Sequence, residues 1–137
     1  LFRSRPATLL FIKQQLADAK KHGMTVIGMM HHGLLQHWKY QNKMIPGYVI
    51  ENNLSIAAMM HKEGLKVMFT GHSHAQDITQ HKGIYDVETG SLVSYPSPYR
   101  LITIQGDNMK ITTHHINTID GYSGKISFKE YSKSYEL

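Results

Sequence analysis

Two histidines separated by a single residue offer the clearest chemistry in this chain. The segment Gly71-His72-Ser73-His74 comes directly after the apolar run 65–70. Histidines at positions i and i+2 of an extended chain point to the same side, so two neutral imidazoles can converge on one metal site. The pattern therefore predicts metal binding by His72 and His74. The alternative is that two surface histidines fall two apart by chance.

A second pair, His31-His32, ends another apolar run, residues 25–30. If the two runs are neighbouring parallel strands, both pairs emerge at the same edge of a sheet. Adjacent residues on a strand face opposite ways, so one of His31 and His32 is expected to bind the metal ion. The other is expected to contact substrate or to make a hydrogen bond that supports a metal-binding residue. His37, in the long irregular loop 33–49, is a further candidate for contacting a ligand bound at the strand ends.

Composition limits the classes of function. The chain has 137 residues, a net charge of +5, ten histidines and no cysteine. The absence of cysteine excludes disulfides, thiolate zinc sites and thiol nucleophiles. The basic residues are scattered without interleaved aromatics, so no nucleic-acid binding is expected, and no apolar run approaches the roughly 20 residues that span a bilayer. The histidines for which no function is expected are His22, His61, His81, His114 and His115.

Hydrophobic periodicity predicts the elements that position these histidines. Apolar residues at spacings of three and four indicate a helix over 6–22, and Asn53 is expected to cap a second helix that ends at Glu63. The apolar runs 25–30 and 65–70 are typical of strands buried on both faces. Because a helix lies between these two strands, the sequence favours a parallel pair in a strand, helix, strand unit.

Beyond Ala75 the pattern changes to short runs rich in Ile, Tyr and Thr, separated by turn signals. The predicted strands are 84–91, 99–105 and 109–116. We expect them to form antiparallel hairpins beside the parallel pair, which makes the fold class α/β with an α+β-like C-terminal part. The chain is then divided into a domain part, 1–116, and a polar end, 117–137, which is expected to be a last strand or a tail.

The arrangement resembles the second half of a calcineurin-like metallophosphoesterase domain. In that family one strand ends in a metal-binding histidine, often within a His-His pair, and the next ends in Gly-His-x-His. The matching residues are His31-His32 and the segment 71–74. The segment from Val87 to Leu92, together with Arg100, is similar to the β-hairpins that end the family's domain. The resemblance covers residues 7–116 and implies a partial metallophosphoesterase sandwich whose N-terminal half is missing.

Carried over residue by residue, the resemblance implies that His31 and His72 bind one metal ion and that His74 binds its partner ion. His32 would be a neighbour of the ligands. Gly33 stands where proline commonly follows the pair, which leaves open whether His31 or His32 is the ligand. The implied cofactors are two divalent ions of Mn, Fe or Zn, and the implied substrate is a phosphomonoester or phosphodiester.

The upstream motifs of the family, Asp-x-His, Gly-Asp and Gly-Asn-His, have no match in position; Gly106-Asp107 lies after the histidine motif. They supply the bridging carboxylate that a two-metal centre needs. We therefore expect a fragment of a phosphohydrolase that is inactive alone and whose true N-terminus lies upstream. Its expected partners are the missing half of the domain or a second copy, in a homodimer or a swapped assembly.

Two other metallohydrolase patterns fit less well. The metallo-β-lactamase pattern His-x-His-x-Asp-His requires aspartate at position 76 and histidine at position 77, where the sequence has Gln76 and Asp77. The amidohydrolase pattern opens an eight-stranded barrel, for which the chain is too short. The alternative is a non-enzymatic, histidine-rich α/β domain that binds metal through its own residues or self-associates. The compartment of the soluble chain, cytoplasmic or exported, stays open.

Overall fold

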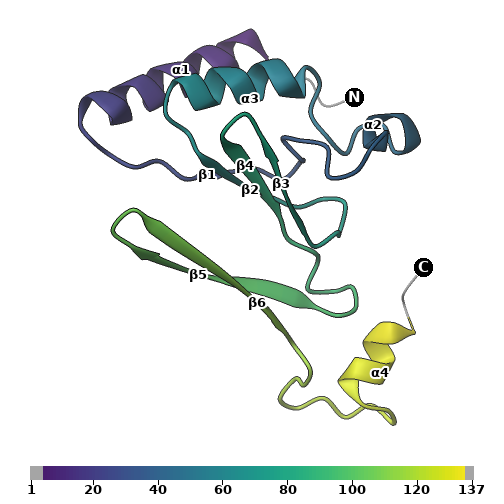
Figure 1. The fold of residues 1–137 in the computed structure, drawn as a ribbon. Helices are drawn as coiled ribbons and strands as arrows, with labels where there is room; N and C mark the ends of the chain where they lie inside the picture. Colours follow the sequence, from purple (N-terminus) through teal and green to yellow (C-terminus); the bar gives the residue numbers. More distant parts are fainter. Residues whose placement is uncertain (1–4, 135–137) are drawn as a thin grey trace. The chain divides into compact units, whose positions relative to one another are not determined.

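The computed structural model describes residues 5–134 of this mixed α/β chain (Figure 1). The first of its two compact units comprises the described part of residues 1–73 together with 77–88, and the second comprises 74–76 and the described part of 89–137. No helix within the described residues is long and apolar enough to cross a membrane. The elements are α1 (Pro6–Lys21), β1 (Gly28–Met29), α2 (Gln41–Met44), α3 (Asn53–Lys62), β2 (Val67–Thr70), β3 (Asp77–His81), β4 (Ile84–Glu88), β5 (Pro98–Gln105), β6 (Asn108–His115) and α4 (Phe128–Lys133).

The first unit is built on a four-stranded sheet with the strand order β1-β2-β4-β3. β1 and β2 are parallel, as the strand, helix, strand order predicts, and Gly28 pairs with Met68. β4 is also parallel to β2, and β3 is antiparallel to β4 at the far edge. The carboxyl ends of β1, β2 and β4 therefore lie at one edge of the sheet, where parallel sheets commonly bind ligands.

Helices α1 and α3 lie side by side on one face of this sheet (Figure 1). The prediction of α1 is confirmed: Pro6 occupies its first turn, and Gly23, with φ of 66°, follows its C-cap. α3 is confirmed too, but its N-cap is Asn52, and Asn53 is a buried residue of the helix itself. The core joins both helices, the loop 33–49 and the strands through Leu16, Leu34, Leu35, Ile50, Ile56, Ala57, Met60, Leu65, Met68 and Ile84.

The face of the sheet that packs in this core becomes polar toward the carboxyl ends of the strands. Along β4, Ile84 belongs to the core, and Asp86 and Glu88 follow on the same face because side chains alternate. Thr70 of β2 is opposite Glu88 in the parallel register. All three polar residues are buried. The chain therefore places two buried carboxylates at the edge of the sheet where the histidines were expected.

The first predicted strand is shorter and more exposed than its apolar run suggests. Only Gly28–Met29 of residues 25–30 forms β1, and Met29 is 83% exposed. Burial on both faces, expected for this run, is therefore wrong. Met29 is exposed because β1 is an edge strand of the sheet, which pairs on one side with β2.

For the chain after Ala75, one expectation is wrong and one strand was missed. β4, expected within an antiparallel set, lies inside the sheet and runs parallel to β2. β3 was not predicted, because its sequence is largely polar; it forms a hairpin with β4. The turn between them, Lys82-Gly83, has φ of 47° and 92°, the left-handed values that a tight two-residue hairpin requires.

The second unit contains the predicted β5–β6 hairpin and a short helix. β5 and β6 are antiparallel, as expected, but they form a two-stranded sheet of their own. α4 lies in the segment 117–137, where a strand or tail was expected. Its start carries a capping box, in which the side chains of Ser127 and Glu130 each accept a hydrogen bond from the other's backbone N–H.

Candidate metal centre

The parallel ladder between β1 and β2 continues past both strands and brings the two histidine segments together. The backbone N–H of Met30 donates to the carbonyl of Phe69 at 3.0 Å, and that of Gly71 donates to the carbonyl of His31 at 3.1 Å. His31 and His72 therefore leave the sheet side by side, although they are 41 residues apart in sequence.

The imidazoles of His31 and His72 point at one another. His72 Nδ1 lies 2.8 Å from His31 Nε2, within hydrogen-bond distance. The ring of His32 is 4.5 Å from that of His72 and 5.3 Å from that of His31, between centroids. The ring of Tyr48, from the end of the loop 33–49, lies 4.6 Å from that of His72. Three histidines from two strand ends thus form one cluster, with an aromatic ring beside it.

Partial burial of His32, followed by the positive charges of His72 and His31, lowers the pKa of His32. His32 therefore favours the neutral form, the form of histidine that binds metal ions.

The backbone around Gly71-His72-Ser73-His74 is a turn, so the extended geometry assumed for this motif is wrong. His72 and His74 have φ of 76° and 58°, in the left-handed region. The chain turns sharply at Gly71, whose carbonyl accepts from the backbone N–H of Ser73 at 3.0 Å. Side chains two apart do not share a side in such a turn, so the i, i+2 argument no longer pairs His72 with His74.

His74 belongs to the second unit, unlike His31 and His72. Its Nδ1 lies 3.0 Å from the hydroxyl of Ser94. A hydrogen bond of this kind fixes the orientation of an imidazole, as metal-binding histidines commonly require.

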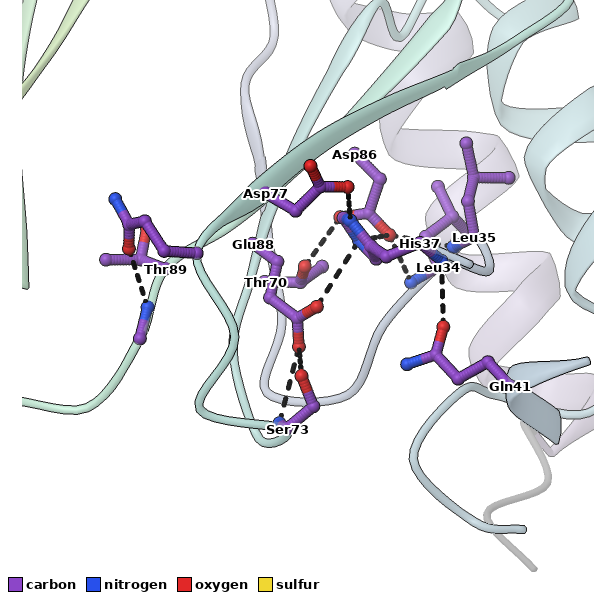
Figure 2. Close-up of polar contacts among 12 residues, drawn as sticks. Leu34, Leu35, His37, Gln41, Thr70, Ser73, Asp77, Asp86, Glu88 and Thr89 are labelled. Atoms are coloured by element: carbon purple, nitrogen blue, oxygen red, sulfur yellow. Dashed lines mark hydrogen bonds and ion pairs between the residues drawn. The ribbon is translucent and has the colours of Figure 1, made fainter. Parts of the chain in front are cut away.

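His37 is not part of the histidine cluster; it lies among carboxylates (Figure 2). Its side chain is 1% exposed, and its Nδ1 lies 2.9 Å from Asp77 Oδ2. Its Nε2 lies 3.5 Å from Asp86 Oδ2 and 3.5 Å from Glu88 Oε2. The side chain of His37 is therefore buried among three acidic residues, and its expected contact with a ligand stays a prediction.

Asp86 and Glu88 also hold the segments that carry the histidine cluster. Asp86 Oδ2 accepts the backbone N–H groups of Leu34 and Leu35, each at 2.7 Å, and Oδ1 accepts the Thr70 hydroxyl at 2.5 Å. Glu88 Oε1 accepts the backbone N–H of Ser73 at 3.3 Å and also its hydroxyl (Figure 2).

These contacts join the loop after His31 and the turn around His72 to one strand, β4. Sequence reasoning missed the role of Asp86 and Glu88, although two acids at alternate positions of an otherwise apolar strand signal buried polar groups.

Burial by itself lowers the pKa of His37, but hydrogen bonding to Asp86 and Asp77 and the negative charges of Asp86 and Glu88 outweigh that effect. The net result raises the pKa of His37 above its ordinary value of 6.5. A protonated His37 is the cationic partner that these buried acids require.

The loop 33–49 also lines an open pocket of about 580 Å³. The ammonium groups of Lys39 and Lys43 lie 4.9 and 5.4 Å from the ring centroid of Tyr40. The residues that line the pocket include no carboxylate: Gln36, His37, Trp38, Lys39, Tyr40, Asn42 and Lys43. Its charge favours an anionic ligand over a cationic one.

The pair of His31 and His72 fits a metal ion with a small adjustment. Two nitrogens bound to one tetrahedral zinc ion, each about 2.05 Å away, are roughly 3.3 Å apart. The observed separation of 2.8 Å would have to widen by about half an ångström. Within residues 5–134, no group of three or more His, Cys, Asp or Glu side chains is arranged to hold a metal ion.

Comparison with known proteins assigns no family to this chain: no family model matches its sequence, and no curated protein matches it significantly.

Proposed function

We propose that this chain is the C-terminal part of a metal-dependent phosphoesterase. His31 and His72 bind one divalent ion, and His74 binds its partner. One observation supports the proposal: His31 Nε2 and His72 Nδ1 converge where two parallel strands end, 2.8 Å apart, about half an ångström closer than two nitrogens bound to one zinc ion. The positively charged pocket of the neighbouring loop supports an anionic substrate.

Each residue has a separate task in this proposal. Two bound divalent ions would activate a water molecule and neutralise charge on a phosphoester during in-line displacement. The chain's part is to direct the imidazoles of His31 and His72 at one point, to fix the ring of His74 through Ser94, and to cover one side of the cluster with Tyr48. The proposal needs a bridging carboxylate from motifs that residues 1–137 do not contain.

Calorimetric titration of the full chain with Zn²⁺ tests the proposed ligands. We expect His72→Ala to lower the Zn²⁺ affinity by about tenfold or more, because even residues that only orient ligands contribute about 10–100-fold. His114→Ala is the matched control and should keep the wild-type affinity, since His114 is an exposed residue of β6 that stacks on Tyr99.

Equal Zn²⁺ affinities for wild type and His72→Ala would contradict the proposal. So would an absence of Zn²⁺ binding by the wild-type chain. Saturable binding that survives removal of both His31 and His72 would favour the alternative, a metal-binding domain with a different ligand set.

We also propose that the exposed edge of β1 makes the chain associate, either with a second copy or with the missing half of its domain. Among the described residues β1 pairs with β2 alone, so its other edge carries no strand, and Ile27 and Met29 are 37% and 83% exposed. Unpaired edges with apolar side chains are sites of strand addition.

Light scattering of the wild-type chain at micromolar concentration should therefore show a dimer or larger species. Met29→Lys should shift the population toward monomer, because a charged side chain blocks edge pairing. Lys110→Met, on the separate β5–β6 hairpin, serves as a surface control. A compact wild-type monomer that binds no hydrophobic dye would show that this edge needs no partner.

A further inference from the structure

One strand, β4, is hydrogen-bonded to both turns that carry the histidine cluster. Through Asp86 it binds the backbone that follows His31, at Leu34 and Leu35, and through Glu88 it binds Ser73, next to His72. The two carboxylates lie on one face of β4, two residues apart. The spacing of His31 and His72 therefore depends on where these two carboxylates sit.

Two carboxylates so close together and so fully buried need a positive charge. Asp86 is 0% exposed and Glu88 1% exposed. Their Oδ2 and Oε2 atoms each lie 3.5 Å from the same atom, His37 Nε2, which has no closer hydrogen-bond partner. Buried charges are stable only when paired, and an imidazolium placed between two carboxylates supplies that pairing.

His37 is itself held by groups on either side. Its backbone N–H donates to the side chain of Gln41 at 2.8 Å, and Gln41 is buried at the start of α2. Its Nδ1 is bound to Asp77 of β3. The imidazole is thus fixed between the loop 33–49 and the two strands β3 and β4.

We propose that His37 is a positioning residue: by bridging Asp86 and Glu88 it sets the separation of the turns that carry His31 and His72. The proposal rests on the proposed function only where it treats those two histidines as metal ligands.

The positioning effect depends on pH because it needs the charged form of His37. The titratable groups facing it are Asp77 from β3 and Asp86 and Glu88 from β4; β2 contributes the Thr70 hydroxyl to Asp86, and its own loop contributes Gln41. Because the pKa of folded His37 is raised above 6.5, its stabilising effect is complete below about 6.5 and is lost as pH rises through the folded pKa.

Hydrogen exchange of the wild-type chain tests this without any mutation. The amides of Leu34, Leu35 and Ser73 donate to Asp86 and Glu88. We expect their protection factors to fall about tenfold per pH unit between 6.5 and the folded pKa of His37, which an imidazole NMR titration measures in parallel. Amides of the β5–β6 hairpin serve as the reference and should show no such step. The proposal fails if His37 titrates at or below 6.5, or if the three amides follow the reference.

A neutral substitution separates positioning from general stability. His37→Gln should remove the pH step in the three amides. At pH 6.5 it should also lower the Zn²⁺ affinity about tenfold below that of wild type. His114→Gln is the matched control and should change neither.

The two proposals fail in different ways. If wild type binds no Zn²⁺ but the amide step is present, the proposed function is wrong and the positioning of the turns stands. If wild type binds Zn²⁺ and His37→Gln binds it equally well, the positioning proposal is wrong. If His37→Gln does not fold, the wild-type exchange experiment decides alone.

Discussion

Replacing Asp86 by Ala is expected to lower the free energy of unfolding by about 3–5 kcal/mol, the cost of removing one partner from a buried charge network. Asp86 is fully buried, accepts two backbone N–H groups and a hydroxyl, and lies 3.5 Å from His37. Its removal leaves those donors without an acceptor inside the protein. Urea denaturation at neutral pH, followed by circular dichroism, measures the effect.

Asp107→Ala is the control for the loss of a carboxylate, because Asp107 is exposed in the turn between β5 and β6. It should change the free energy of unfolding by no more than about 0.5 kcal/mol, as surface substitutions usually do. If Asp86→Ala were equally mild, the network around His37 would not organise the first unit as described above.

The second large effect concerns hydrolysis. The 137-residue chain alone is expected not to hydrolyse bis-nitrophenyl phosphate with Mn²⁺, Zn²⁺ or Fe²⁺, because a two-metal centre needs a bridging carboxylate. In a protein that joins this chain to the upstream motifs, His72→Ala or His74→Ala should lower kcat/KM by about 100-fold or more. Metal stabilisation of the transition state contributes several kcal/mol, and each 1.36 kcal/mol is worth about a factor of ten.

His114→Ala in the same longer protein should leave kcat/KM within about twofold, since surface positions away from a site rarely matter. Turnover by residues 1–137 that a chelator abolishes would contradict the account. It would mean that the chain holds a complete catalytic set.

Local pattern predicted those parts of the fold that depend on short-range signals. The helix after Pro6 and the hairpin turn at Gly106 follow from periodicity and turn residues alone. The meeting of His31 and His72 also followed from sequence, because both end apolar runs separated by a helix.

The remaining features depend on contacts between distant residues. His37 is a lone histidine in an irregular loop, and its sequence neighbours give no sign of acidic partners; β3 and β4 supply Asp77, Asp86 and Glu88. β3 itself is a polar segment that becomes a strand only by pairing with β4. Which strands pair in this way depends on contacts across the whole fold, and local strand propensity does not predict those contacts.

The turn after β2 shows a different limit of sequence reasoning. An i, i+2 spacing predicts a shared side only when the backbone is extended, and the sequence did not reveal that His72 and His74 adopt left-handed φ values. Gly71 signalled a bend, but the backbone N–H of Ser73 within this turn donates to Glu88, a residue from another strand that the local sequence does not indicate.

The central claim is that His31 and His72 bind the same metal ion. Anomalous diffraction from crystals of the chain equilibrated with Zn²⁺, recorded on both sides of the zinc absorption edge, tests it most directly. The account predicts a zinc peak about 2.1 Å from both His31 Nε2 and His72 Nδ1, with the two nitrogens moved apart to make room. It would be contradicted by a map in which these nitrogens keep their 2.8 Å contact and zinc lies elsewhere or nowhere.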